Sequence, residues 1–173
     1  MFYQLQKNRR SIRKFSDKQV ENEKIDIILK SALLSPSSRS RKPWEFLVVT
    51  DNVLLEKLSK CREHSSKFLS GARLGIIVIA NPNKSDVWIE DTSIASINIQ
   101  LAAQSLGLGS CWIQIRQRLH SQDKSAEDYI KELTQIPEGY RIESIIAIGY
   151  PDEKKKPHEE ITLPNEKIHF NRY

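Results

Sequence analysis

The 173-residue sequence predicts a fold that combines helices with buried strands. Four short apolar runs rich in β-branched residues, at positions 45–50, 74–80, 110–115 and 144–149, predict the strands. Other segments have apolar residues three and four positions apart, as on one face of a helix. Hydrophobic residues make up 39% of the chain and charged residues 28%, which suits one domain of ordinary size, residues 1–173, with a core of its own.

The first half of the chain contains two predicted helices and two predicted strands. A helix is expected over residues 22–34, with Pro36 following where a helix should stop. A strand at 45–50 and a helix at 52–60 come next. The run 74–80 predicts a strand that is buried on both faces, and the turn residues 81–83 end it.

The most apolar predicted helix covers residues 91–106. Its two apolar stripes are Ile94, Ile97, Leu101 and Ser105, and Ala95, Ile99, Ala102 and Leu106. A helix that is apolar on two faces is buried between other elements, so a subunit interface is a good candidate. Glu90 and Asp91 come just before it and are interpreted as N-terminal capping residues that complement the helix dipole.

The second half closes the predicted fold with two strands and a helix. Glycines at 107 and 109 end the apolar helix and lead into the strand at 110–115. Residues 125–128 resemble a capping box and predict the start of a helix. The strand at 144–149 is the last buried element. The polar tail from Pro151 onward has no clear period, so it should lie along another surface.

Composition excludes several classes of protein. The longest apolar run, 76–80, is far too short to cross a bilayer, and the first residues lack the apolar stretch of a signal peptide. Two cysteines, Cys61 and Cys111, do not make a disulfide framework, and Cys111 reads as a small core residue. We therefore expect a cytoplasmic protein that has no membrane partner.

The net charge of +5 is concentrated in discrete clusters at 7–14, 39–42, 116–118 and 154–156. Such clusters suit a small anionic ligand better than a nucleic acid, so no nucleic-acid partner is expected. The four histidines are scattered without the spacing of metal ligands, and no metal is expected. No glycine-rich phosphate loop or dinucleotide fingerprint is present.

The first candidate site is the basic cluster around Ser11, which contains Arg9, Arg10 and Arg13. Guanidinium groups bind phosphate through paired, charge-assisted hydrogen bonds, and a hydroxyl adds another contact. The alternative is an ordinary solvated basic arm, because short basic runs are common.

The second candidate site is the loop at 36–44, where three serines and two prolines precede Trp44. A loop of this kind has backbone groups free to bond the polar edge of a flat heterocycle, with the tryptophan as an anchor in the core. A plain surface connection is the alternative. Gln114, on the strand at 110–115, either bonds a heterocycle or faces water.

The order of these motifs resembles the FMN-dependent nitroreductase family over nearly the whole chain. The start of that family is similar to Arg-Arg-Ser-Ile-Arg-Lys-Phe at 9–15 and to Ser-Pro-Ser-Ser at 35–38 ahead of a Pro-Trp pair. Its central helix and following strand resemble residues 90–95, 98–103 and 106–113. Its last strand resembles 137–140 and 147–151.

The resemblance implies an α+β fold with a central, mostly antiparallel sheet between helices. It also implies a homodimer with FMN at the interface and a C-terminal tail that wraps the partner subunit. By position, Arg9, Arg10 and Ser11 would hold the FMN phosphate, and Arg13 would reach the ribityl chain or the pyrimidine edge. Among the lysines that follow the last strand, Lys155 and Lys156 would complete the phosphate site.

The same resemblance assigns the flavin ring to other segments. Those that would line the ring from the other subunit are Pro36, Ser37, Ser38 and Ser40. Those that would pass beneath the ring are Ile113, Gln114 and Ile115, and Ser65 is a further possible contact. Ser40 and Lys42 stand where many members have Asn and Gln, which bears on the donor and substrate preference.

The implied function is an FMN-dependent oxidoreductase that takes hydride from NADH or NADPH. The flavin carries the chemistry, and no side chain need act as a nucleophile. Its acceptor would be an electron-poor small molecule such as a nitroaromatic, a quinone or an activated alkene. The alternative is a non-catalytic flavin-binding or regulatory module.

Overall fold

The computed structural model describes residues 1–64 and 66–173 and contains a four-stranded antiparallel sheet. The strand order is β1-β2-β6-β3. These strands are β1 (Trp44–Val49), β2 (Leu74–Ala80), β3 (Gly109–Gln114) and β6 (Arg141–Gly149). Two short strands, β4 (Leu119–Ser121) and β5 (Lys124–Ser125), pair separately. The expected α+β fold with an antiparallel sheet is confirmed.

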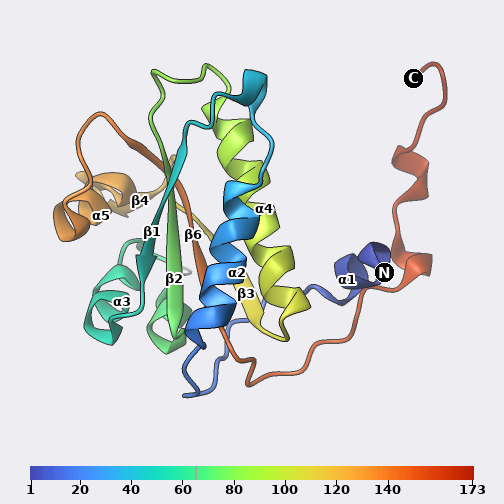
Figure 1. Cartoon of the computed structure of the whole chain (residues 1–173), viewed down its shortest axis with the longest axis horizontal. Coiled ribbons are helices and arrows are strands. Elements are labelled where there is room, and N and C mark those ends of the chain that lie inside the picture. Colours follow the sequence, from blue (N-terminus) through green and yellow to red (C-terminus); the bar gives the residue numbers. More distant parts are fainter. Residues whose placement is uncertain (65) are drawn as a thin grey trace.

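Helices cover both faces of the sheet (Figure 1). One face carries α2 (Asn22–Leu33) and α4 (Trp88–Ser105), and the other carries α3 (Asn52–Leu58) and α5 (Ala126–Thr134). Ser125 caps α5 by accepting a hydrogen bond from the backbone of Asp128, as the capping box predicts. Short 3₁₀ helices lie at Ser38–Ser40, Lys67–Gly71, Glu160–Thr162 and Asn165–Lys167.

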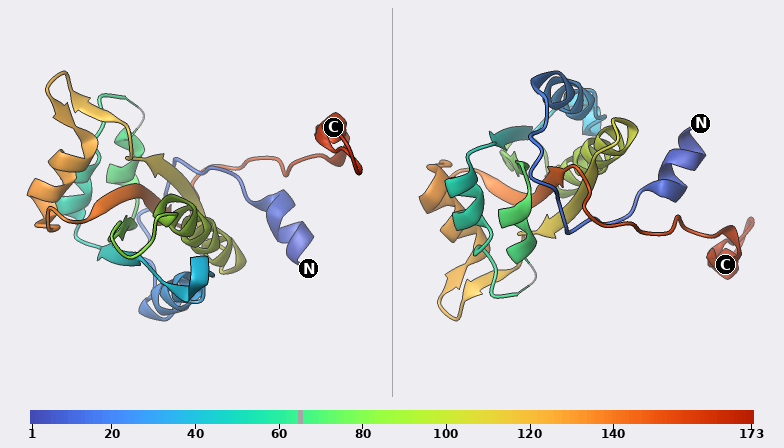
Figure 2. Two further views of the ribbon diagram at one scale, coloured as in Figure 1. Left: turned by 90° about the horizontal axis from the view of Figure 1, so that it is seen from above. Right: turned by 90° about the horizontal axis from the view of Figure 1, so that it is seen from below.

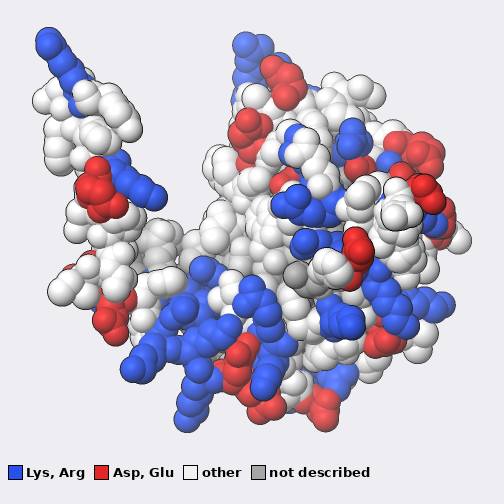
Figure 3. Space-filling model, turned by 180° about the vertical axis from the view of Figure 1, so that it is seen from behind, with Lys and Arg blue, Asp and Glu red and all other residues white. Residues whose placement is uncertain are grey.

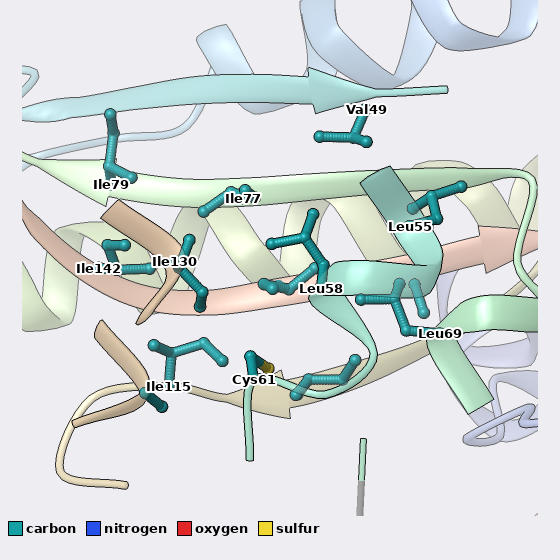
Figure 4. Packing of buried hydrophobic residues seen from close by; sticks show 14 of the residues in the cluster. Val49, Leu55, Leu58, Cys61, Leu69, Ile77, Ile79, Ile115, Ile130 and Ile142 are labelled. Carbon is teal, nitrogen blue, oxygen red and sulfur yellow. The ribbon is translucent and has the colours of Figure 1, made fainter. Parts of the chain in front are cut away.

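The sheet is buried on both faces because β2 and β6 are apolar on both. Leu74, Ile76 and Val78 of β2 join the core under α2 and α4. Ile77 and Ile79 of the same strand point the other way and join the core under α3 and α5, which Figure 4 shows from close by. This alternation follows from the two-residue repeat of a strand and confirms the prediction for 74–80.

A β-bulge interrupts this alternation in β6 at Glu143. Val78 pairs with Ser144, whereas the next residue of β2, Ile79, pairs with Ile142. The extra residue keeps Ile142 and Ile145, three positions apart, on the same face. The strand therefore begins at Arg141, three residues before the start that the unbroken apolar run predicts.

The described residues bury one of the two apolar stripes of α4 and leave the other partly exposed. Ala95 and Ile99 are fully buried, whereas Ile94 and Ile97 are each 38% exposed. The outward stripe is the one that the sequence marks as a candidate subunit interface.

Both ends of the chain extend away from the sheet and lie near each other (Figure 2). A helix that the sequence did not predict, α1 (Phe2–Asn8), has no buried residue. It contacts the tail, where the His158 backbone N–H donates to the Lys7 carbonyl at 2.9 Å. The large apolar side chains exposed on the tail are Ile161, Leu163, Ile168, Phe170 and Tyr173. No helix in the described part of the chain is long and apolar enough to cross a membrane.

The close contact between Gly109 and Ile12 gives a test of this arrangement. A Cβ added at Gly109 would lie 2.8 Å from the Ile12 Cβ. We expect Gly109→Ala to lower the free energy of unfolding by about 1–3 kcal/mol, because the segment at 11–15 has to move. Gly139→Ala is the control, since a Cβ there meets nothing within 4 Å. Equal effects of the two variants in denaturant titrations would contradict the close packing.

Candidate functional site

The candidate site forms where the N-terminal segment crosses the edge of the sheet. The Ile12 backbone N–H donates to the Ser110 carbonyl at 3.0 Å, and Ser11 forms a parallel bridge with Ser110. Further on, the Ser16 N–H donates to the Tyr150 carbonyl at 2.9 Å. These contacts fix the basic cluster beside the start of β3.

The C-terminal lysines meet the N-terminal basic cluster, although some 145 positions separate them in the sequence. Lys155 donates through Nζ to the Ser11 carbonyl at 2.6 Å. The Arg10 guanidinium donates to the Lys156 carbonyl. Figure 3 shows the dense group of basic side chains beside the base of the projecting tail. The structure thus brings Arg10 and Ser11 together with Lys155 and the backbone of Lys156. Arg9 adjoins Arg10 in the sequence.

An acidic residue that sequence reasoning missed, Glu153, fastens these two segments. Its Oε1 accepts from the backbone N–H of Arg13 at 2.5 Å and from that of Lys14 at 3.1 Å. These backbone donors, with Lys155 nearby, hold the pKa of the Glu153 carboxyl below its usual value. The acidic pair Asp152-Glu153 ahead of three lysines was the only signal in the sequence.

The loop after α2 has an unusual backbone held by a buried carboxylate. Arg39, Ser40 and Lys42 have φ angles of 50°, 56° and 47°, in the left-handed region that non-glycine residues rarely adopt. The Ser37 hydroxyl accepts from the Lys42 N–H at 2.9 Å, which closes the turn.

Asp91 is the carboxylate that holds this loop, which corrects its predicted role as a capping residue. Its Oδ1 accepts from the Ser38 N–H at 2.8 Å, and its Oδ2 accepts from the Ser85 hydroxyl at 2.9 Å. The residue at the N-cap of α4 is Val87, three residues before Glu90, and no side chain caps the helix there. Glu90 and Asp91 do lie in the first turn, where acidic groups suit the helix dipole.

Within one chain the loop and the basic cluster lie at opposite ends of α4. The loop is tied to Asp91 in the first turn, and Ile12 packs against Gly109, just after the last turn. Eighteen helical residues span about 27 Å. One chain therefore does not bring Pro36, Ser37, Ser38 and Ser40 to the basic cluster.

The predicted residues 113–115, at the end of β3 and just after it, point to different faces of the sheet. Ile113 and Ile115 are 1% and 0% exposed and pack in the core under α3 and α5. Gln114 is half-buried, and its Oε1 accepts from the Trp112 indole N–H at 2.9 Å. Cys111 is buried as predicted, and burial raises the pKa of its thiol.

Two further predictions concern Ser65 and metals. Ser65, the predicted flavin contact, lies outside the described residues. Phe68, three residues after Ser65 in the sequence, lies under Arg13: the guanidinium carbon is 5.7 Å from the centre of the ring.

Among residues 1–64 and 66–173, no group of three or more His, Cys, Asp and Glu side chains is placed to hold a metal ion.

Comparison with known proteins places this chain in a family. The model of the nitroreductase family matches residues 7–67 and 56–150. The chain therefore belongs to the nitroreductase family, a family of oxidoreductases.

Individual relatives are similar to this chain over most of its length. An FMN-dependent nitroreductase from Clostridium difficile R20291 is 50% identical, with a TM-score of 0.96 over 98% of both chains. A protein from Archaeoglobus fulgidus, provisionally named NADH dehydrogenase/NAD(P)H nitroreductase, is 39% identical over 155 residues, which are 87% of this chain and 86% of that protein. An iodotyrosine deiodinase from Thermotoga neapolitana is 24% identical over 179 residues, covering 94% and 96% of the two proteins.

Removing the Asp91 carboxylate should loosen the loop at 36–42. We expect Asp91→Ala to destabilise the protein by about 1.5–3 kcal/mol, because buried hydrogen bonds to a charged group are lost. The Ser38 amide should then exchange with solvent much faster in hydrogen-exchange measurements. Glu90→Ala is the control, because Glu90 is an exposed neighbour in the same turn. A Ser38 amide that stays protected would contradict this role of Asp91.

The Glu153 contact should weaken in acid. Its folded pKa lies below 4.5, the ordinary value of the carboxyl, so its contribution to stability is complete above that pH and is lost as the pH falls through the folded pKa. Glu153→Gln should reproduce the acid state at pH 7 and speed exchange of the Arg13 amide by about tenfold. If Arg13 exchange is unchanged by the variant and by acid, Glu153 does not anchor the segment.

Proposed function

We propose that this protein is an FMN-dependent oxidoreductase that takes hydride from NADH or NADPH and reduces electron-poor small molecules. The observation that carries the proposal is the basic cluster, in which residues from both ends of a nitroreductase-family chain converge on Ser11. An FMN-dependent nitroreductase that is 50% identical over nearly the full length supports the choice of cofactor.

The donor set of the cluster fits a terminal phosphate. Arg9, Arg10, Lys155 and Lys156 supply positive charge, and Ser11 supplies a hydroxyl, for a group that carries almost two negative charges. Arg13, above Phe68, would face the sugar chain or the ring. When bound, FMN supplies the hydride-transfer chemistry, and the residues of the chain bind and orient it.

A second copy of the chain would complete the site. Pro36, Ser37, Ser38 and Ser40 lie about a helix length from the cluster in their own chain, so in this proposal they reach the ring from the partner. The exposed stripe with Ile94 and Ile97 and the apolar side chains of the tail provide surface for such a dimer. In this arrangement the C-terminal tail wraps the partner subunit.

The chain's own cations would favour the reduced flavin. Positive charge from Arg13, and from Lys42 of the second copy, would stabilise negative charge that develops at the pyrimidine edge of the ring. Lys42 and Ser40 would also meet the molecule stacked on the flavin, so they would influence the choice of donor and acceptor. Nitroaromatics, quinones and activated alkenes are the proposed acceptors.

The visible spectrum of the purified protein tests the proposal. With FMN added, a flavin spectrum should bleach on anaerobic addition of NADH or NADPH and return when an acceptor is supplied. A bound flavin that neither nucleotide reduces would favour the non-catalytic flavin-binding module. A protein that retains no FMN would refute the proposed cofactor.

A double substitution tests the assignment of Arg9 and Arg13 to the FMN site. Arg9→Ala with Arg13→Ala should weaken FMN binding by at least about tenfold, because two charge-assisted contacts are lost. Lys57→Ala with Lys60→Ala, on exposed positions around α3, removes the same charge elsewhere and should leave the affinity unchanged. Equal FMN affinity of the two double variants in fluorescence titrations would refute the assignment.

A further inference from the structure

Glu143 is a buried acidic residue that the proposed function does not use. Its side chain belongs to the β6 bulge and is 4% exposed. Its Oε1 lies 3.3 Å from the Gln114 Nε2, and its Oε2 has no hydrogen-bond partner among residues 1–64 and 66–173. A buried oxygen without a partner costs about 1–3 kcal/mol, so its presence calls for a functional explanation.

The contacts of Gln114 fix which way its amide group points. The indole N–H of Trp112 can only donate, so the atom that faces it at 2.9 Å has to be the amide oxygen. The Gln114 Nε2 then faces two acceptors, the Arg116 carbonyl at 3.2 Å and the Glu143 carboxyl. Both amide hydrogens are used within the chain, so Gln114 can offer a ligand only the remaining lone pair of its oxygen.

The bulge explains how Glu143 reaches Gln114. The Glu143 carbonyl accepts from both the Ile115 and the Arg116 N–H groups, at 3.1 and 3.2 Å. Gln114 lies opposite Ser144, whose hydroxyl meets Ser96 of α4 at 3.0 Å. The extra residue thus places an acceptor-only side chain beside Gln114, on the face of the sheet that α4 covers.

We propose that Glu143 is a positioning residue, which holds the Gln114 amide with its oxygen available to the flavin assigned to β3. This inference rests on the proposed function. A flavin ring gains N–H groups on reduction, so a fixed acceptor beside it favours the reduced ring and raises its reduction potential. Without Glu143 the amide keeps only its contacts with Trp112 and Arg116, so its orientation is held less firmly and that preference weakens.

Charge at Glu143 is the competing explanation, and two substitutions separate it from positioning. Burial raises the pKa of Glu143, with Arg116 lowering it and Glu90 raising it further. Glu143→Gln keeps an acceptor of the same shape and removes the charge. Glu143→Leu removes both. Ser144→Ala is the matched control, because it removes the neighbouring buried hydrogen bond to Ser96 and leaves the three hydrogen bonds of the Gln114 side chain in place.

The experiment measures the Gln114 side-chain amide by NMR, and the reduction potential of FMN in the loaded protein. Glu143→Leu should speed exchange of the Gln114 NH₂ hydrogens by about three- to tenfold and lower the flavin potential. Glu143→Gln and Ser144→Ala should keep both values close to those of the unaltered protein. Unchanged NH₂ exchange in Glu143→Leu, or an equal potential shift in Glu143→Gln, would overturn the proposal.

The measurements also distinguish this proposal from the proposed function. Glu143→Leu should keep or raise the unfolding temperature, because it removes a buried oxygen without a partner. Trp112→Phe is the second variant, since it frees the same amide from its other side and should shift the potential in the same direction. If the protein binds no FMN, the proposed function fails, and the role of Glu143 toward the flavin fails with it. The Gln114 NH₂ hydrogens should even then exchange more slowly in the unaltered protein than in Glu143→Leu.

Discussion

The attachment of the N-terminal segment to the edge of the sheet is the constraint on which the candidate site depends. The bond from the Ile12 N–H to the Ser110 carbonyl and the bond from the Ser16 N–H to the Tyr150 carbonyl hold this segment across the ends of β3 and β6. The close approach requires residues without a Cβ, because one at Gly109 would collide with Ile12 and one at Gly149 would lie 3.0 Å from Phe15.

Because of this attachment, two basic clusters from opposite ends of the chain share one surface. Like charges repel, so their approach needs compensation. Glu153 provides part of it by accepting the backbone N–H groups of Arg13 and Lys14 while pairing with Lys155 at 3.6 Å. An anionic ligand would supply the rest, which is the physical reason that a phosphate suits this surface.

α4 sets the second constraint, because it separates the two parts of the proposed site. Its first turn carries Asp91, which holds the strained loop, and its far end leads to Gly109 and the basic cluster. Its inner stripe packs in the core, and its outer stripe remains exposed at Ile94 and Ile97. In the proposed dimer, a second copy covers this outer stripe and its loop reaches the cluster.

Much of the fold could be predicted from the sequence because strong periodicity accompanies the buried elements. The run at 74–80 and the helix at 22–33 have nearly the bounds that their patterns predict. The pattern was misleading where one residue broke it: Glu143 forms a bulge, and β6 therefore begins earlier than the apolar run indicates. Helix α1 was missed because it buries no residue and its seven residues are too few to show a repeating apolar pattern.

The candidate site was predictable only in part. Basic residues near a serine suit both a phosphate site and an ordinary solvated basic arm, and only the order of the family's motifs favours the phosphate. Asp91 looked like a helix cap because acids before an apolar stretch usually are, whereas the helix begins three residues earlier and buries this carboxylate. Glu153 and Glu143 act through contacts between distant segments, which no local pattern reveals.

A mixed dimer would test the central claim, that a cluster from one copy and a loop from another build each FMN site. One subunit would carry Arg9→Ala and Arg13→Ala, and the other would carry Asp91→Ala. Each variant alone should bind FMN poorly at both sites. In the mixed dimer both defects fall on the same site, so one FMN per dimer should bind with normal affinity. Weak binding at every site of the mixed dimer would show that cluster and loop act within one chain, contrary to this account.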